Sequence, residues 1–195
     1  MCGMKAFLLA IWEVAEVVLV AVVTVFIIRS FLVQPFLVSG ASMEPNFGSG
    51  NYLLVDEISY RLREPQRGEV VVFKYPNNPS TFYIKRIVGL PGEKVEIKQG
   101  AIYIFNPDAP ERFVLKEDYL VSGLKTAGNV STTLGSNDYF VLGDNRNYSY
   151  DSRSWGTLDK KYIVGLARLR LFPVTEAKVF NYTDVSSSFN LAPSN

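Results

Sequence analysis

The sequence contains no histidine, and this absence excludes several familiar kinds of catalytic and metal site. Histidine is the usual proton shuttle near neutral pH and the commonest metal ligand. A Ser/His/Asp triad, a Cys/His dyad and a histidine-ligated zinc site are therefore impossible. The single cysteine, Cys2, allows neither an internal disulfide nor a cysteine-cluster metal site, so we expect no metal.

The sequence also lacks an excess of charge of one sign. It has 20 Lys and Arg residues against 19 Asp and Glu residues in a chain of 195 residues. Nucleic-acid binding normally needs a basic surface, so this balanced composition indicates no nucleic-acid partner. The length suits one compact domain of ordinary size with an appendage.

Residues 6–28 form one long apolar run, which only Glu13, Glu16 and Thr24 interrupt. As a helix, this run would be roughly 35 Å long, enough to cross a bilayer. We therefore predict a short cytoplasmic start and a single transmembrane helix within residues 1–35. A buried helix, a cleaved signal peptide and an amphipathic surface helix are the alternatives. One basic residue flanks each end of the run, so charge does not determine its orientation.

From residue 50 onward the pattern changes to short β-branched and aromatic runs that glycine and proline separate. The runs are YLLV (52–55), EVVVFKY (69–75), TFYIKRIVGL (81–90), KVEI (94–97), AIYIF (101–105), YFVL (139–142) and VGLARLRLF (164–172). We therefore predict a mainly β domain over residues 36–174. Residues 106–138 are expected to be a variable excursion with weak strands of its own, and residues 175–195 a polar, loosely ordered tail.

A Gly/Ser turn follows the apolar segment, with the sequence SGASMEPNF at 39–47. Its proline, Pro45, restricts the backbone just beyond Ser42. A nucleophilic serine must be presented on a constrained turn so that its hydroxyl and a backbone N–H face the same carbonyl. Most turns of this composition are only turns, so Ser42 is a candidate nucleophile that needs a base.

Lys85 lies inside the strand-like apolar run YIKRIVG at 83–89. Strand alternation would put Lys85 on one face and Arg86 on the other, so that one of the two cations points toward the buried side. Burial disfavours an ammonium and lowers its pKa, which would make a lysine a usable base in a chain without histidine. The simpler alternative is a lysine on an edge strand whose ammonium reaches solvent.

A third polar stretch, GDNRNYSYDSRSWG at 143–156, directly follows an apolar strand. Its spacing does not fit a calcium loop, because, counted from Asp144, arginine and tyrosine stand at the third and fifth positions, where ligands are required. We predict instead a polar network in which Asp144 and Asp151 pair with Arg146 or Arg153 and orient neighbouring hydroxyls. Maintenance of structure alone would also explain such a network.

The three stretches, in this order behind an apolar N-terminal segment, resemble the type I signal peptidases. The blocks that carry the likeness are SGASMEPNF (39–47), RGEVVVFKYP (67–76), YIKRIVGLPGEKV (83–95) and GDNRNYSYDSRSWG (143–156). The resemblance implies an antiparallel β-sheet catalytic domain behind one transmembrane helix. It also implies a catalytic pair, with Ser42 as the nucleophile and Lys85 as the general base.

The resemblance also assigns supporting roles and shows departures. Ser149 falls on the serine that hydrogen-bonds the catalytic lysine in this family, and the backbone N–H of Ser42 would form part of the oxyanion hole. The charged positions that support the site fall on Asp144, Arg146, Asp151 and Arg153. Gly40 stands at the position that, in some members, donates a side-chain hydroxyl to the oxyanion hole as a second donor. The usual Thr-Leu after the proline is Asn46-Phe47, and a usual Asp-Asn is Asn147-Tyr148.

The function that the resemblance implies is removal of signal peptides from exported preproteins, by cleavage after small residues of the Ala-x-Ala type. An acyl-enzyme on Ser42 would be hydrolysed by water that Lys85 activates, without a cofactor. The expected location is the plasma membrane, with the catalytic domain on the extracytoplasmic side and the lipid bilayer as a second partner. Two alternatives remain. One is a non-enzymatic, membrane-tethered β domain that binds a protein partner, and the other is a peptidase that cuts its own chain. The sequence leaves the oligomeric state undetermined.

Overall fold

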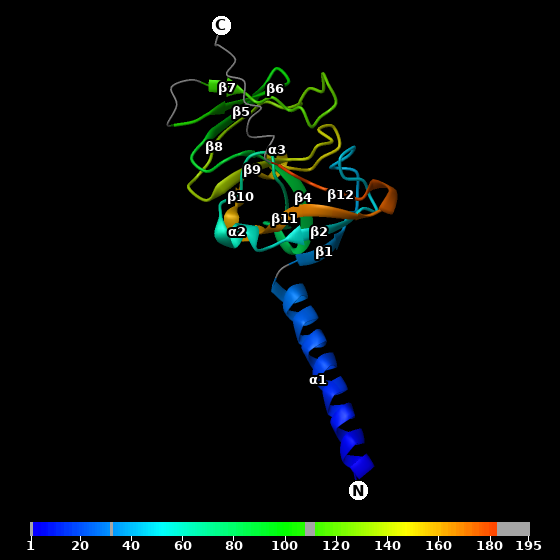
Figure 1. Cartoon of the computed structure of the whole chain (residues 1–195). Helices are drawn as coiled ribbons and strands as arrows, with labels where there is room; N and C mark the ends of the chain where they lie inside the picture. Colours follow the sequence, from blue (N-terminus) through cyan, green and yellow to red (C-terminus); the bar gives the residue numbers. More distant parts are fainter. Residues whose placement is uncertain (1, 32, 108–111, 183–195) are drawn as a thin grey trace.

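In the computed structural model, which describes residues 2–31, 33–107 and 112–182, a single long helix projects from a β-rich body (Figure 1). The helix, α1 (Cys2–Phe31), contains 30 residues and leads into the first strand of the body. Within the described residues, no helix combines the length and the apolar character required of a membrane span.

The body is built around an eight-stranded sheet in which every strand pair is antiparallel. Its strands, in spatial order, are β1 (Val33–Leu37), β2 (Tyr52–Asp56), β11 (Ile163–Phe172), β3 (Val70–Tyr75), β4 (Asn78–Gly89), β9 (Asp138–Leu142) and β10 (Leu158–Asp159), with β12 (Lys178–Val179) paired to β11. The short helices of the body are α2 (Ser59–Leu62), α3 (Ser152–Trp155), η1 (Lys160–Tyr162) and η2 (Val174–Glu176).

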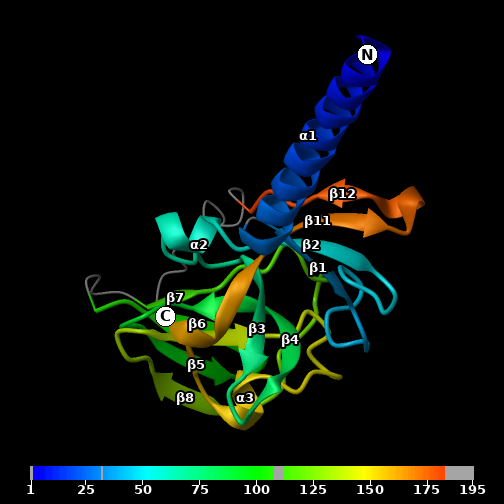
Figure 2. The same ribbon diagram turned by 90° about the horizontal axis from the view of Figure 1, so that it is seen from below.

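A second, four-stranded sheet has the order β7 (Arg112–Val114), β6 (Ala101–Phe105), β5 (Lys94–Lys98) and β8 (Val130–Thr133). Figures 1 and 2 both place this sheet on the side of the body away from α1. The outer strands β7 and β8 come from the predicted excursion at 106–138, and they pair with β6 and β5. The described part of the excursion therefore contributes strands to the second sheet.

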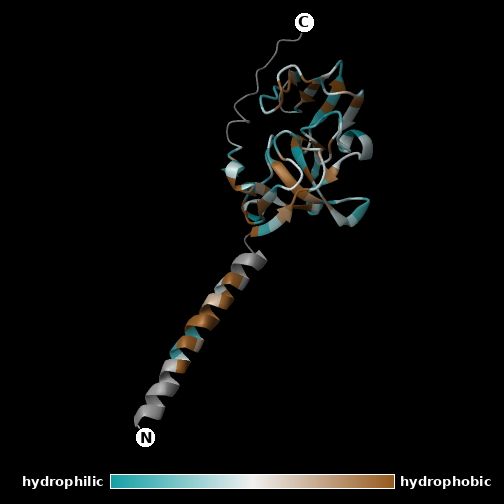
Figure 3. Cartoon of the chain, turned by 90° about the vertical axis from the view of Figure 1, so that its right-hand side faces the viewer, coloured by the Kyte–Doolittle hydropathy of each residue, from teal (hydrophilic) through white to brown (hydrophobic). Residues whose placement is uncertain are grey.

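Three clusters of buried apolar side chains form the core. One cluster joins the two sheets, and its members are Val88, Val95, Ile97, Ile102, Ile104, Leu115, Leu134, Phe140 and Leu142. The other two lie against the large sheet, around Leu53 and around Phe73. Figure 3 shows hydrophobic residues along the middle of α1 and in strands of the body, and hydrophilic residues in many of the connections.

The prediction of a mainly β, antiparallel fold is confirmed, and each of the seven predicted runs corresponds to a strand. The first part of the predicted polar tail, residues 175–182, packs on the body. It contains β12, and the hydroxyl of Tyr182 donates to the Ala167 carbonyl at 2.6 Å. The rest of the tail, residues 183–195, lies outside the described residues.

The close packing between β2 and β11 leads to a first testable prediction, which concerns Gly165. A Cβ at Gly165 would lie 2.6 Å from the Asp56 carbonyl oxygen and 2.8 Å from Val55 Cγ1. Because a backbone oxygen cannot move aside cheaply, Gly165→Ala should lower the free energy of unfolding by about 1–3 kcal/mol. Urea unfolding of the purified protein measures this difference. Gly48→Ala is the matched control, since a Cβ there would meet nothing within 4 Å; equal stability of both variants would contradict the prediction.

Candidate active site

Ser42 lies in the connection between β1 and β2, and buried residues on both sides hold it in place. Met43 and Phe47 are each 1% exposed and form an isolated β-bridge around the turn. The two ends of the connection are tied together, because Val38 N donates to the Asn51 carbonyl and Gly50 N to the Val38 carbonyl, both at 2.9 Å. Ser42 itself is partly exposed, so its hydroxyl is both constrained and accessible.

Lys85 extends from β4 to the Ser42 hydroxyl. Its Nζ donates to Ser42 Oγ at 2.7 Å and to the Ile84 carbonyl at 2.9 Å. The side chain pair that the resemblance implies is therefore in hydrogen-bond contact, although 43 residues separate the two positions.

The prediction that only one of the two adjacent cations points to the buried side is wrong. Lys85 is 3% exposed and Arg86 is 4% exposed. The alternation of a strand holds, but both faces of β4 are covered at this point, since residues 85–89 are all buried. One cation contacts the Ser42 turn and the other contacts the connection that follows β9.

Burial lowers the pKa of Lys85 from 10.5 to about 8, while the carboxylates of Asp151 and Asp144 act in the opposite direction. Within the described residues, no carboxylate lies within 4.0 Å of the Lys85 ammonium. The other buried cations, Arg67, Arg86 and Arg146, each form an ion pair. Lys85 is thus the buried cation of the described structure that can give up its proton near neutral pH.

The residues after β9 hold the Ser42 turn from the other side. Asn145 N donates to the Ser42 carbonyl at 3.1 Å, and the Asn145 side-chain amide donates to the Ala41 carbonyl at 3.0 Å. Asp144 N donates to Met43 Sδ at 3.4 Å. Within the described residues, the Ser42 N–H donates to no protein acceptor, so it is available to an oxygen in the adjoining cavity.

Two buried carboxylates organise this connection. Asp151 accepts from Arg153 Nε and Nη2, each at 2.8 Å, and from Gly143 N at 3.1 Å, so the prediction of its pairing is right. Asp144 pairs instead with Arg86, at 2.8 Å from Nε and 2.6 Å from Nη2. The prediction that Asp144 pairs with Arg146 or Arg153 is wrong, because strand β4 brings a closer guanidinium to it.

Arg146 has a partner that the sequence analysis missed. Its guanidinium forms an ion pair with Glu117 and hydrogen bonds to Thr126 Oγ1 and to the Gly143 carbonyl. The side chain of Arg146 is fully enclosed, whereas that of Glu117 is 14% exposed. Glu117 lies in the excursion at 106–138, and no local sequence pattern marks it as part of a site.

Ser149 lies beside the pair but makes a different contact from the one that the resemblance implies. Between the described residues, no hydrogen bond joins Ser149 to Lys85, and Ser149 Oγ is enclosed without a hydrogen-bond partner. A Cβ at Gly143 would lie 2.2 Å from Ser149 Oγ and 2.4 Å from the Ser42 carbonyl oxygen. Gly143 therefore lets Ser149 and the Ser42 backbone approach each other closely.

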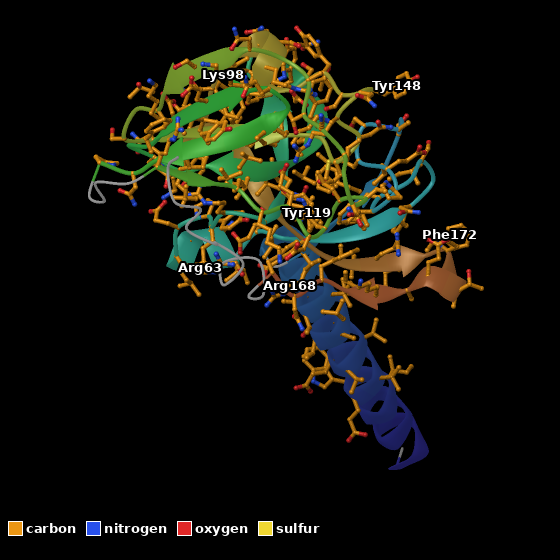
Figure 4. All side chains as sticks on the ribbon, turned by 90° about the horizontal axis from the view of Figure 1, so that it is seen from above. Arg63, Lys98, Tyr119, Tyr148, Arg168 and Phe172 are labelled. Atoms are coloured by element: carbon orange, nitrogen blue, oxygen red, sulfur yellow. The ribbon has the colours of Figure 1, made fainter. Side chains whose placement is uncertain are left out.

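A cavity of about 370 Å³ opens next to the pair. One wall is the outer edge of β1 with the residues that lead to Ser42, and the other is the part of β4 before Lys85. Phe36 and Phe82 both line it and contact each other, with ring centroids 5.3 Å apart. Tyr148, which is 79% exposed and lies at the rim of the body in Figure 4, lines the same cavity.

The described residues contain no group of three or more His, Cys, Asp or Glu side chains that could hold a metal ion. The buried carboxylates behind Ser42, Asp144 and Asp151, are paired with Arg86 and Arg153.

Comparison with known proteins shows a match to one protein family and to several of its members. The family described as "Signal peptidase, peptidase S26" matches residues 11–172. The chain is 35% identical over 167 residues to a probable signal peptidase I-2 of Synechocystis sp., with 83% of this chain and 73% of that protein covered. It is 37% identical over 136 residues to signal peptidase I V of Bacillus subtilis, with 66% and 80% covered.

Signal peptidase IB of Staphylococcus aureus is 36% identical over 152 residues, with 72% of this chain and 78% of that protein covered. Among solved structures, a signal peptidase I of Enterococcus faecalis V583 is 30% identical. That structure covers 53% of this chain and 97% of its own, with a TM-score of 0.45.

These matches define the class as a serine peptidase, so the alternative of a non-enzymatic binding domain is wrong. The chain belongs to the signal peptidase family, peptidase S26. Its activity is the removal of signal peptides, and its substrates are preproteins that carry them.

The lowered pKa of Lys85 leads to a second testable prediction, which concerns the nearby carboxylate of Asp151. Asp151 favours the Lys85 ammonium, so Asp151→Asn should lower the Lys85 pKa below its value of about 8. The change would also leave Arg153 without its carboxylate, which acts in the same direction. Titration of the lysine Cε resonances by NMR, with Lys85 assigned from its absence in Lys85→Arg, measures the effect. Asp159→Asn, at an exposed ion pair, is the control; an unchanged or higher pKa in Asp151→Asn would refute the assignment.

Proposed function

We propose that Ser42 is the nucleophile of this peptidase and Lys85 its general base. The observation that carries the proposal is the 2.7 Å hydrogen bond between Lys85 Nζ and Ser42 Oγ, made by an amine whose pKa burial lowers to about 8. An amine with this pKa is neutral in about half of the molecules at pH 8, so it can accept a proton under physiological conditions.

The proposed reaction has two steps. Neutral Lys85 takes the Ser42 proton as Oγ attacks the scissile carbonyl carbon, and the resulting ammonium then protonates the leaving amine as the C–N bond breaks. This leaves an acyl-enzyme on Ser42 and a neutral lysine. Lys85 next takes a proton from water, the hydroxyl attacks the ester carbonyl, and the proton returns to Ser42 Oγ as the peptide leaves as a carboxylic acid.

The backbone N–H of Ser42 is the proposed oxyanion donor. Two features support this role: the N–H has no described protein acceptor, and Asn145 N fixes the Ser42 carbonyl at 3.1 Å. A donor that is held in place before the reaction stabilises the developing charge without reorganisation. Gly40 has no side-chain hydroxyl, so this position supplies no second side-chain donor to the oxyanion hole.

The substrate is proposed to bind as an extended strand between β1 and β4. The outer edge of β1 has no partner strand in the described sheet, and β4 pairs with β9 only from Arg86 onward. Two strand edges that line one cavity suit a peptide that adds main-chain hydrogen bonds on both sides. The proposed cut follows small residues of the Ala-x-Ala type, since aromatic side chains such as Phe36 and Phe82 narrow the cavity.

The supporting residues are proposed to hold these two loops rather than to react. Asp144 and Arg86 connect the residues after β9 to strand β4, and Asp151 with Arg153 fixes the end of the same connection. Arg146 binds the Gly143 carbonyl at 3.0 Å, next to the close contact between Ser149 and the Ser42 backbone. Ser149 is proposed to pack against the pair and to restrict the positions open to its side chains.

We propose a membrane location as well, with α1 as the anchor and the body on the extracytoplasmic side of the plasma membrane. The support is the exposure of large apolar side chains along the described part of the helix, including Trp12 at 71%, Val17 at 69% and Leu19 at 62%. Apolar side chains exposed in this way along one helix mark a surface that needs an apolar environment. Ser42 is 11 residues beyond the end of α1 at Phe31, so cleavage would take place close to the bilayer surface.

The catalytic assignment makes the third testable prediction. Ser42→Ala and Lys85→Ala should each lower kcat for an Ala-x-Ala preprotein by on the order of 10⁴-fold or more, because nucleophile and base act as a unit. Lys85→Arg should be equally inactive, since a guanidinium stays protonated. Gel analysis of preprotein cleavage by detergent-solubilised protein measures the rates. The control Lys98→Ala, at the exposed end of β5, should retain full activity; a folded Ser42→Ala variant that still cuts would overturn the assignment.

The proposed membrane anchor leads to a fourth testable prediction. The full chain should stay in the membrane fraction through an alkaline carbonate wash, whereas a chain that begins at residue 33 should be released, because the truncation removes the apolar surface of α1. Immunoblots of the two fractions measure the distribution. External protease should digest the body in spheroplasts if it lies outside; release of the full chain by carbonate would refute the anchor.

A further inference from the structure

The residues between β7 and β8 extend from the small sheet to the active site. One end is tied to β6, where Leu115 N donates to the Ile102 carbonyl at 2.8 Å and Leu115 is 7% exposed. The other end is tied near Gly100, whose carbonyl accepts from Thr126 N at 3.0 Å, and Thr126 is 1% exposed. Both ends therefore belong to the small sheet, while the residues between them are free to contact the large one.

The part that reaches the site is Glu117–Tyr119, which we call the brace. Its side chains alternate in direction: Lys116 and Asp118 form an ion pair that is about half exposed, at 50% and 55%, whereas Glu117 and Tyr119 point inward. Figure 4 shows Tyr119 over the middle of the body, far from the rim.

Glu117 acts on the loop after β9 through Arg146. The carboxylate binds Arg146 Nη1 at 2.8 Å and also contacts Nη2, and Arg146 Nε in turn donates to the Gly143 carbonyl at 3.0 Å. Gly143 is also the residue where an added Cβ would collide with both Ser149 Oγ and the Ser42 carbonyl oxygen. A displacement of Arg146 would therefore change the position of the backbone directly behind the nucleophile.

Tyr119 contacts both loops of the site. Its carbonyl accepts from the Asn46 side-chain amide at 2.9 Å, and the same amide donates to Asp144 Oδ2 at 2.9 Å. Its ring lies 4.0 Å from the Arg86 guanidinium, in the geometry of a cation–π contact. Its hydroxyl donates to Glu117 Oε1 at 2.5 Å, which joins the two inward side chains of the brace.

We propose that Glu117 and Tyr119 are positioning residues for the Ser42–Lys85 pair. The brace couples the small sheet to the turn that carries Ser42, through Asn46, and to the loop behind it, through Arg146. This inference rests on the proposed roles of Ser42 and Lys85. It gives Glu117 and Tyr119 a positioning role, although neither lines the cavity.

Two substitutions test the brace with little change of shape. Glu117→Gln removes the charge that holds Arg146, and Tyr119→Phe removes only the hydroxyl that joins Tyr119 to Glu117. Asp118→Asn is the matched control, because it lies between them on the same segment and its side chain is exposed. Each variant is assayed at saturating and limiting preprotein concentrations, at least ten degrees below its own melting temperature, and kcat is expressed per folded enzyme.

The expected result is a change in kcat with little change in KM. Misplacement of catalytic groups by a fraction of an ångström to 1 Å costs roughly ten- to a hundredfold in rate, so Glu117→Gln should lower kcat by that range and Tyr119→Phe by several-fold. KM should stay within about twofold, because the brace does not line the cavity. Asp118→Asn should match the wild type. The effects of Glu117→Gln and Arg146→Gln should not add in the double variant, since both break one connection.

If Tyr119→Phe and Glu117→Gln both keep the wild-type kcat per folded enzyme, the proposed positioning role of the brace is wrong. If Glu117→Gln does not fold, Tyr119→Phe decides alone, since it removes a single hydroxyl. Additive effects of Glu117→Gln and Arg146→Gln would also refute the route through Arg146. A failure of this inference is distinguishable from a failure of the proposed function, because Ser42→Ala in the same assay stays inactive in the first case and cuts in the second.

Discussion

The proposed catalytic pair depends on one hydrogen bond between a buried amine and a partly exposed hydroxyl. Enclosing an ammonium in protein is costly unless a carboxylate compensates its charge. Around Ser42 the carboxylates are already taken by arginines, so Lys85 remains without a close counter-ion in the described structure. The cost of burial then appears as a pKa lowered to about 8 and as a reactive neutral amine.

The arginine pairs and the lysine therefore have complementary roles. Arg86, Arg146 and Arg153 are held in fixed geometry by acidic partners, and each also donates to a backbone carbonyl. These bonds fix strand β4, the residues just before β3 and the loop after β9 relative to one another. Charged groups that are fully paired give rigidity to the site, while the group without a close counter-ion is free to change its protonation state.

Because the chain has no histidine, the proposed general base is a lysine. A lysine in water would be protonated near neutral pH, and burial brings the pKa of Lys85 into the useful range. The environment that lowers the pKa of Lys85 also positions its Nζ at 2.7 Å from Ser42 Oγ. Activation and positioning of the proposed base thus come from the same burial.

Much of this was predictable from local patterns. The seven β runs became strands because β-branched and aromatic residues between glycine and proline favour extended chain. The sequence predicted that Asp151 pairs with Arg146 or Arg153, and the partner is Arg153. The absence of histidine and the single cysteine excluded several other kinds of catalytic and metal site. The order of the motifs identified Ser42 and Lys85 as the candidate pair.

Tertiary structure alone decided the contacts between distant segments. Arg86 rather than Arg146 pairs with Asp144, both Lys85 and Arg86 are buried, and Glu117 holds Arg146 from the other sheet. Strand alternation describes the two faces of one strand, but it does not say which loops cover them. Ion pairing in a folded chain depends on distance in space, and residues separated by 29 or 58 positions become neighbours only when the sheets assemble. The sequence by itself determined which kinds of chemistry are possible, because it has no histidine. The fold determined which cation lies without a close carboxylate and which cations are paired, because these contacts join segments that are distant in the sequence.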